Sequence, residues 1–334
     1  MILLTFGTRP EYIKIKPLID IFDKHAYPYK VLFTGQHTTL LPADAYSAID
    51  ISLDIDNGIN RLDSIVGSLM NQSHIWVNNF SYVLVQGDTT SAFSLALAAF
   101  HRKMPIVHLE AGLRTHDVYN PYPEEFNRQA ISKIASIHFC PTNISAQNLK
   151  NEGIESGIYV TGNTVLDNLV NIGVMNENII PITMHRRENH DIIHLWFEQF
   201  ESLAQKHPEL QFVFPMHPNP HVQKHRHVLK SVNVIDPLSC DKFINLLAKS
   251  RLVISDSGGI QEEASFLKKR VIVCRKKTER VEGLGTFFEL CEDPSELSEL
   301  FARMLKQDKI NDTIGCPFGD GHAAEKIYNI LKDL

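Results

Sequence analysis

The sequence is poor in tryptophan and cysteine and has no long apolar run. Of its 334 residues only 2 are Trp and 5 are Cys, and no two cysteines form a CxxC pair. This pattern excludes a zinc ribbon or a dithiol redox motif, so we expect reduced thiols and no metal. No stretch reaches the roughly 18 apolar residues that a membrane span needs. The first residues, MILLTFGTRPEY, lack the basic start of a signal peptide, and we expect a cytoplasmic protein without a membrane partner.

An excess of positive charge is also absent. The chain has 33 Lys and Arg against 39 Asp and Glu, a net charge of −6, which excludes general nucleic-acid or membrane-surface binding. Its 43% hydrophobic and 22% charged residues are ordinary for a globular protein. The length exceeds that of one typical domain and favours two.

Short apolar runs alternate with segments of helical periodicity. The runs cover residues 2–6, 29–34, 82–86, 105–109 and 137–140 in the first half, and 180–184, 211–216, 232–235, 252–255 and 270–274 in the second. Runs without polar alternation, separated by helices, indicate parallel sheets that are covered on both faces. Because the pattern occurs twice, we predict an α/β fold of two Rossmann-like, doubly wound domains, with the junction near residues 165–178. Ligands bind such sheets at the carboxyl edge.

The stretch TFGTRPEYIKIKPL follows the first predicted strand. Gly7 permits a tight turn, and Pro10 suits the first turn of a helix. Arg9 and Lys14 then lie close to the positive end of that helix, where they form a candidate anion site. The alternative is an ordinary turn with solvated charges.

Carboxylates follow two later strands. Asp88 comes after the strand and glycine of VLVQGD, and Glu110 ends the strand of VHLE. Neighbouring parallel strands would bring both to one edge, and Glu124 or Glu125 could reach it from the next helix. Converging carboxylates repel one another, and some then have the raised pKa that general acid–base catalysis uses. For Asp88 the alternative is a helix N-cap.

Two arginines, Arg114 and Arg128, accompany these acids and could hold some of them ionised. A Mg²⁺ site and a surface cluster of ion pairs are the competing interpretations of the same residues.

The second half repeats the arrangement with other residue types. His185 in MHRREN and His217 in MHPNP end its first two strands, at a spacing unlike that of a zinc site. In LVISDSGGIQEEASFL, Ser257, Gly258 and Gly259 then open a helix. Glycine lets a ligand approach the backbone, and the helix N–H groups favour an anion.

An acidic residue about one turn further, Glu262 or Glu263, can accept hydrogen bonds from the hydroxyls of a ribose. The stretch RKKTER adds four cations for a diphosphate: Arg275, Lys276, Lys277 and Arg280. Together these residues indicate a nucleoside diphosphate site, with a linked sugar next to the acids of the first half.

In combination, the motifs resemble the non-hydrolysing UDP-N-acetylglucosamine 2-epimerases. They occur in the order of that family and span nearly the whole chain: FGTRPE, TGQH, QGDTTS, HLEAGLRT, PYPEEFNR, TGNTVLD, HRREN, HPNP, SDSGGIQEEA, TER and PFGDGHAAEKI. The resemblance implies a GT-B-like fold with its active site in the interdomain cleft. Residues 1–168 then form the first domain, completed by a final helix at 319–334, and residues 169–318 form the UDP-binding domain.

The implied reaction interconverts UDP-GlcNAc and UDP-ManNAc without a cofactor, and it supplies ManNAc-type sugars for surface polysaccharide. UDP leaves by anti elimination across C1–C2 to give 2-acetamidoglucal, and it then returns with protonation of the opposite face of C2. The family also implies a homodimer. Carried over by motif, the catalytic positions are Asp88, Glu110, Glu124 and His185, and the UDP-binding positions are Arg9, Lys14, His217, Ser257, Gly258, Gly259, Glu263 and Arg280.

Some positions depart from the family pattern. After QH the family usually has charged or amide residues that help to bind a second UDP-GlcNAc as an activator, and here Thr39 cannot provide an amide. We therefore expect weak substrate activation or none. The proline after TER is Val281 here, and a modified UDP-sugar, such as a diacetamido sugar or its uronic acid, is the alternative substrate.

Three other functions compete with this interpretation. A hydrolysing epimerase would release free ManNAc and UDP, and such relatives carry GGE where this chain has EAG. A GT-B glycosyltransferase needs an acceptor and exchanges no hydrogen at C2. A sensor of nucleotide sugars would leave Asp88 and Glu110 without a role.

Overall fold

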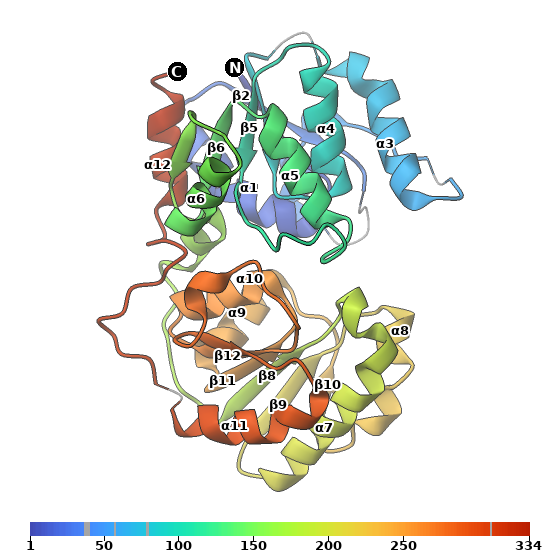
Figure 1. Ribbon diagram of the computed structural model, residues 1–334, viewed down its shortest axis with the longest axis vertical. Coiled ribbons are helices and arrows are strands. Elements are labelled where there is room, and N and C mark those ends of the chain that lie inside the picture. The colour runs from blue at the N-terminus through green and yellow to red at the C-terminus, as the bar shows by residue number, and fades with distance from the viewer. Residues whose placement is uncertain (37–40, 57, 78–79, 308) are drawn as a thin grey trace. The chain divides into compact units, whose positions relative to one another are not determined.

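The computed structural model describes residues 1–36, 41–56, 58–77, 80–307 and 309–334. They form two compact units: unit 1 is Met1–Asn168 together with Gly319–Leu334, and unit 2 is Leu169–Phe318 (Figure 1). Each unit is an α/β layer structure, so the prediction of two Rossmann-like domains is confirmed. None of the helices in the described ranges has the length and apolar character that crossing a bilayer requires.

Unit 1 is built on a parallel sheet with the strand order β3-β2-β1-β4-β5-β6-β7. Its strands are β1 Ile2–Phe6, β2 Tyr29–Phe33, β3 Ile51–Ser52, β4 Tyr82–Gln86, β5 Ile106–Leu109, β6 Ile137–Cys140 and β7 Ile158–Val160. Its helices are α1 Arg9–Lys24, α2 Ala43–Ala48, α3 Arg61–Asn71, α4 Thr90–Phe100, α5 Glu124–Ile134, α6 Asn143–Asn151 and α12 Ala323–Leu331, with 3₁₀ turns η1 Gln72–Ile75 and η2 Thr164–Leu169. The order reverses between β1 and β4, which is the point where such sheets bind ligands.

Alternate residues of the strands bury apolar side chains on opposite faces of this sheet. Leu4 of β1 belongs to one core with Ile15 of α1 and Ile327 of α12. Its neighbour Leu3 belongs to the other core, with Leu95 of α4. Helices on both faces explain why the strands read as continuous apolar runs.

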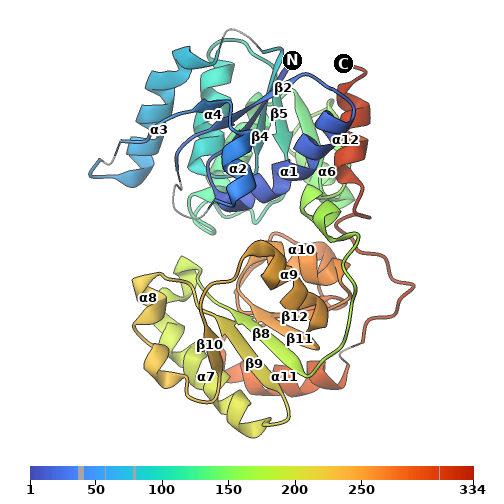
Figure 2. The same cartoon turned by 180° about the vertical axis from the view of Figure 1, so that it is seen from behind.

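The last helix completes unit 1. In both views α12 lies beside α1 (Figures 1 and 2). The carboxylate of Asp167 accepts hydrogen bonds from the backbone N–H groups of Ala323, at 3.0 Å, and Ala324, at 2.7 Å. A carboxylate at this helix end satisfies two amides that have no partner within the helix.

Unit 2 has a second parallel sheet, with the order β10-β9-β8-β11-β12-β13. Its strands are β8 Ile179–Thr183, β9 Gln211–Pro215, β10 Asn233–Ile235, β11 Leu252–Ser255, β12 Arg270–Val273 and β13 Phe288–Leu290. Its helices are α7 Ile193–Lys206, α8 Pro220–Gln223, α9 Cys240–Lys249, α10 Gly258–Phe266 and α11 Leu297–Lys306, with 3₁₀ turns η3 Arg187–Ile192, η4 Arg226–Val228, η5 Val281–Gly283 and η6 Pro294–Glu296. Helices α7 and α11 cover one face, and α9 and α10 the other (Figures 1 and 2).

Aromatic side chains dominate the core beneath α7 and α11. Phe197 and Phe200 of α7 and Phe301 of α11 are fully buried. They pack in one cluster with Ile182 of β8 and Phe214 of β9. This core keeps the central strands in place, so the loops at their carboxyl ends start from a rigid edge.

Candidate active site

In unit 1, two candidate acids follow neighbouring strands. Strands β4 and β5 pair in parallel with Gln86 opposite Leu109, so Asp88 and Glu110 follow at the same edge of the sheet. Glu110 has a φ of +64°, in the left-handed region that residues other than glycine rarely adopt. Such backbone strain is typical of residues whose position matters for function.

Three side chains hold the carboxylate of Glu110, which is buried. Its Oε2 accepts hydrogen bonds from Lys14 Nζ, at 2.5 Å, and from Gln86 Nε2, at 2.6 Å. Its Oε1 accepts one from Asn163 Nδ2, at 3.1 Å. Because these donors come from three separate elements, the carboxylate has one well-defined position.

Asp88 has the electrostatics of a proton carrier. Arg128 Nη2 lies 2.9 Å from its Oδ2. The pKa of the Asp88 carboxyl is nevertheless raised above its ordinary value, because desolvation outweighs Arg128 and the nearby charges of Glu124 and Glu110 act in the same direction. A raised carboxyl pKa suits proton transfer closer to neutral pH.

The first two residues of α5 have different roles. Glu125 is fully buried, and its two oxygens accept hydrogen bonds from the backbone N–H groups of Thr115, at 3.0 Å, and His116, at 3.1 Å. Glu125 therefore holds the loop after β5. Oε2 of Glu124 is also buried but accepts no hydrogen bond from the described residues. Of the two alternatives, Glu124 is thus the one whose carboxylate does not hold the loop after β5.

Two expectations for unit 1 need correction. The N–H groups of Gly7 and Thr8 at the start of α1 bind Oε2 of Glu11, at 2.6 and 2.8 Å, so the chain's own carboxylate occupies the predicted anion site. Lys14 contacts Glu110, and Arg9 lies partly exposed in the first turn of α1. The binding of UDP by these two cations stays a prediction.

Arg114 does not accompany the candidate acids. It is buried and forms two hydrogen bonds with the carboxylate of Glu152, at 2.7 and 2.9 Å, and a third with Ser132 at 3.0 Å. These bonds link the loop after β5 to Ser132 of α5 and to Glu152 at the end of α6. The candidate acids Asp88, Glu110 and Glu124 form an acidic trio. Of the two predicted arginines, Arg128 is the one that pairs with a carboxylate of this trio, that of Asp88.

In unit 2, two histidines follow the neighbouring strands β8 and β9. The rings of His185 and His217 stack with their centroids 5.6 Å apart and an interplanar angle of 21°. Asp256 follows β11, on the other side of β8, and Oδ2 of Asp256 accepts hydrogen bonds from the backbone N–H groups of His185, at 2.9 Å, and Arg186, at 2.8 Å. The ends of three adjacent strands thus form one polar edge.

The glycines at the start of α10 serve different purposes. A Cβ on Gly258 would lie 2.4 Å from Nη1 of Arg280, so only glycine allows the guanidinium to pack there. A Cβ on Gly259 would meet nothing within 4 Å, which leaves space over the first turn of the helix. The N–H of Ser257, at the N-cap, donates to Ser255 Oγ at 2.9 Å.

Two arginines that follow β12, Arg275 and Arg280, are buried in ion pairs within unit 2, and their binding of a diphosphate stays a prediction. Nε of Arg280 donates to Glu262 at 2.5 Å, and its Nη1 binds Glu279. Arg275 is fully buried and also binds Glu279, at 3.1 Å. Because Glu262 is buried in this network, Glu263, which is partly exposed, is the acid accessible to a ribose.

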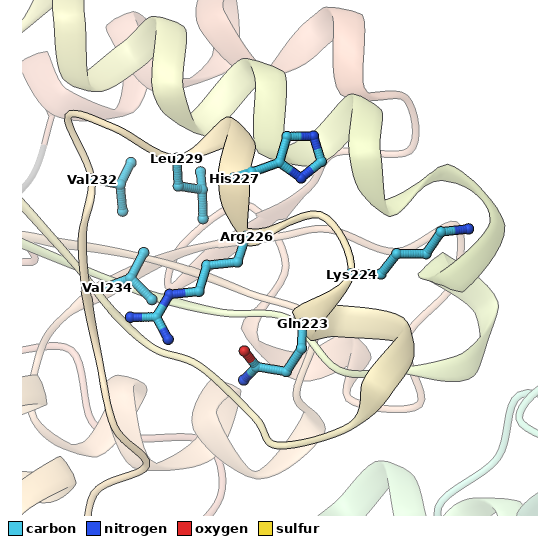
Figure 3. A pocket seen from close by; sticks show the side chains of 7 residues that line it. All are labelled: Gln223, Lys224, Arg226, His227, Leu229, Val232 and Val234. Atoms are coloured by element: carbon cyan, nitrogen blue, oxygen red, sulfur yellow. The ribbon is translucent and has the colours of Figure 1, made fainter.

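A pocket of about 620 Å³ lies elsewhere in unit 2, and no candidate site residue lines it. Figure 3 shows Lys224 pointing away from the three apolar side chains of the wall. The lining residues are Gln223, Lys224, Arg226, His227, Leu229, Val232 and Val234. Within the described ranges, no three His, Cys, Asp or Glu side chains are grouped as a metal site requires. Thr39, which underlies the expectation about substrate activation, lies outside the described residues.

Comparison with known proteins decides the family. The family model described as UDP-N-acetylglucosamine 2-epimerase matches residues 21–332. The chain belongs to this family. It is 39% identical to the UDP-N-acetylglucosamine 2-epimerase of Campylobacter jejuni over 373 residues, covering 99% of this chain and 97% of that protein.

Solved structures agree with the family assignment. The UDP-GlcNAc 2-epimerase of Neisseria meningitidis bound to UDP-GlcNAc superposes with a TM-score of 0.89 at 34% identity, covering 100% of both chains. Acinetobacter baumannii MurG, a GT-B protein, has a TM-score of 0.55 at 11% identity, covering 100% of this chain and 99% of its own, and shows likeness of fold alone.

Three residues at the site were missed by sequence reasoning: Gln86, Asn163 and Asp256. Gln86 and Asn163 bind Glu110, and Asp256 binds the loop that carries His185. Gln86 and Asp256 each stand at the end of an apolar run, the same signal that drew attention to Glu110. Asn163 has no such signal, because it contacts Glu110 from 53 residues away.

Proposed function

We propose that this protein interconverts UDP-GlcNAc and UDP-ManNAc by eliminating and re-adding UDP across C1–C2 of the sugar. The observation that carries the proposal is the acidic trio of unit 1. Asp88, Glu110 and Glu124 are close enough for the charges of the two glutamates to raise the pKa of Asp88. Membership of the family supports UDP-GlcNAc as the substrate.

The chemistry explains why several acids are needed. The hydrogen on C2 is not acidic, and it becomes removable only as the C1–O bond to UDP breaks and positive charge develops on the ring. One carboxylate then takes the C2 proton, and UDP leaves with the bonding electrons to give 2-acetamidoglucal. In the return step the C1–O bond forms again and an acid protonates C2 on the opposite face. Two faces therefore require two proton carriers.

Among the three acids, the contacts support different roles. Glu110 has a fixed carboxylate, held by Lys14 and two amides, which suits a base. Asp88 has a raised pKa, which suits an acid. We propose these two as the proton carriers, with the unoccupied oxygen of Glu124 as the group that binds substrate or shuttles the proton.

For the UDP moiety we propose the start of α10 in unit 2. The space over Gly259 admits a diphosphate to the N-terminal turn of a helix, where N–H groups and the dipole favour an anion. Ser257 and Glu263 flank this turn, and Glu263 is accessible to the ribose hydroxyls. Electrostatic stabilisation of the departing diphosphate is the main contribution expected of this site.

Incubation with UDP-GlcNAc in D₂O tests the proposal. NMR should show deuterium at C2 of both UDP-GlcNAc and UDP-ManNAc. Release of free ManNAc and UDP as the main products would identify a hydrolysing enzyme, and unlabelled UDP-GlcNAc would support a glycosyltransferase or a sensor. Faster exchange with a UDP-diacetamido sugar would reassign the sugar and keep the reaction. The homodimer stays a prediction, which light scattering after gel filtration tests.

A further inference from the structure

Asp256 lies between two strand ends of unit 2. It follows β11, and its N–H donates to the carbonyl oxygen of Thr183 at the end of β8, at 3.2 Å. This bond brings the side chain beneath the loop that begins with His185. The side chain is fully buried.

One oxygen of Asp256 holds the backbone of that loop. Oδ2 accepts hydrogen bonds from the N–H groups of His185 and Arg186 and from Asn189 Nδ2, at 2.9, 2.8 and 3.1 Å. Three donors are as many as one carboxylate oxygen usually accommodates. Its structural role is therefore complete without the other oxygen.

The second oxygen faces the imidazole. Oδ1 is buried and accepts no hydrogen bond from the described residues, and it lies 3.6 Å from Nδ1 of His185. A buried carboxylate oxygen without a donor is costly, and an Nδ1–H at that position would remove most of the cost. Contacts of this kind are often long in the absence of substrate.

We propose that Asp256 is a positioning residue that keeps the single ring proton of neutral His185 on Nδ1 and leaves Nε2 for the substrate. The ring is further oriented by stacking on His217. Desolvation lowers the pKa of His185, Asp256 acts in the opposite direction, and the nearby Arg186 and His190 add to the lowering. The tautomer assignment stands by itself, whereas its use in catalysis rests on the proposed function.

The change Asp256→Asn separates the two roles of the carboxylate. The amide oxygen can replace Oδ2 and keep the bonds to the loop, while the NH₂ group takes the place of Oδ1. That group donates a hydrogen bond to Nδ1 and forces the proton of His185 onto Nε2. The matched control is Asn189→Ala, which loosens the same loop, because Asn189 bonds both Asp256 and the carbonyl of Cys274. It leaves Nδ1 facing a carboxylate.

NMR of protein with ¹⁵N-labelled histidine measures the tautomer directly, with His185→Gln to assign the signal. We expect Nδ1–H in the wild-type protein and in Asn189→Ala, and Nε2–H in Asp256→Asn. An Nε2–H tautomer in the wild-type protein overturns the proposal, and so does an unchanged tautomer in Asp256→Asn. This result is independent of whether the protein is an epimerase.

Steady-state kinetics with UDP-GlcNAc test the catalytic part. A wrong tautomer in a comparable Asp–His pair lowers kcat by roughly 10⁴-fold, and we expect a loss of roughly 10²–10⁴-fold here with KM changed less than about threefold. Asn189→Ala should keep most of kcat. Equal losses of kcat in the two variants would mean that Asp256 acts only through the loop, which contradicts a role in positioning the proton.

Discussion

Replacing Glu110 by glutamine removes one charge and keeps the shape of the side chain. The amide can place its oxygen toward Lys14 and Gln86, but its NH₂ group then faces Nδ2 of Asn163, which is itself a donor. Asn163 cannot turn its own oxygen around freely, because that oxygen accepts the N–H of Val165 at 3.2 Å. The variant loses the buried hydrogen bond from Asn163, and the hydrogen bond from Lys14 weakens. Together these changes should lower the unfolding free energy by about 2–4 kcal/mol. For a unit of this size the melting temperature should fall by roughly 5–15 °C.

The effect on turnover should be larger than the effect on folding. If Glu110 carries the C2 proton, Glu110→Gln lowers kcat by roughly 10²–10⁴-fold at a temperature where the variant is folded. Proton NMR in D₂O measures the rate of deuterium incorporation at C2 of UDP-GlcNAc, and circular dichroism gives the melting temperature of the same sample.

Glu152→Gln is the matched control. It also neutralises a carboxylate bound by a cation in unit 1, since Glu152 pairs with Arg114, but it lies outside the acidic trio. It should lose stability and keep kcat within about threefold. Deuterium incorporation by Glu110→Gln at nearly the wild-type rate would refute the assignment of Glu110 as a proton carrier.

Three further predictions concern the two units. Asp88→Asn should lower kcat but stabilise the fold at neutral pH. The expected gain in unfolding free energy is about 1.4 kcal/mol for each unit by which burial raises the pKa of Asp88. Urea unfolding should show the full gain above the pKa of Asp88 in the folded protein and no gain below pH 3.8. Gly258→Ala should displace Arg280 and lower the unfolding free energy by about 1–3 kcal/mol, and calorimetry should show weaker UDP binding. Gly259→Ala should change the unfolding free energy by no more than about 1 kcal/mol. Burial lowers the pKa of His108 to about 3, so the wild-type fold should lose about 1.4 kcal/mol per unit of pH below 6.5 through this residue, and equal pH slopes for His108→Gln and wild type would contradict this.

The central strands were predictable because they are buried on both faces. The apolar runs at residues 2–6, 82–86, 137–140 and 252–255 coincide with β1, β4, β6 and β11. Strands β3, β7 and β13 match none of the predicted runs. They lie at the sheet edges, contain only two or three residues and are partly exposed, so they leave no clear apolar run in the sequence.

The candidate site was predictable in outline but not in its pairings. The ends of apolar runs identified Asp88 and Glu110, because parallel strands present their carboxyl ends at one edge. Sequence could not decide between Glu124 and Glu125, since adjacent helical residues point in different directions and only the fold shows that the preceding loop binds Glu125. For the same reason the burial of Arg280 against Glu262 was not foreseen.

Because α12 covers the sheet beside α1, unit 1 draws on both ends of the chain, while unit 2 is continuous between them. Once residue 318 has been synthesised, every residue of unit 2 is present in the nascent chain, whereas unit 1 still lacks α12. Unit 1, begun first, still exposes the apolar face that Ile327 and Leu331 will bury. Domains tend to fold as units during synthesis, so the earlier part of this protein must wait for the later one. A short deletion at the C-terminus should therefore damage the N-terminal half, and during translation that half is the one exposed to aggregation.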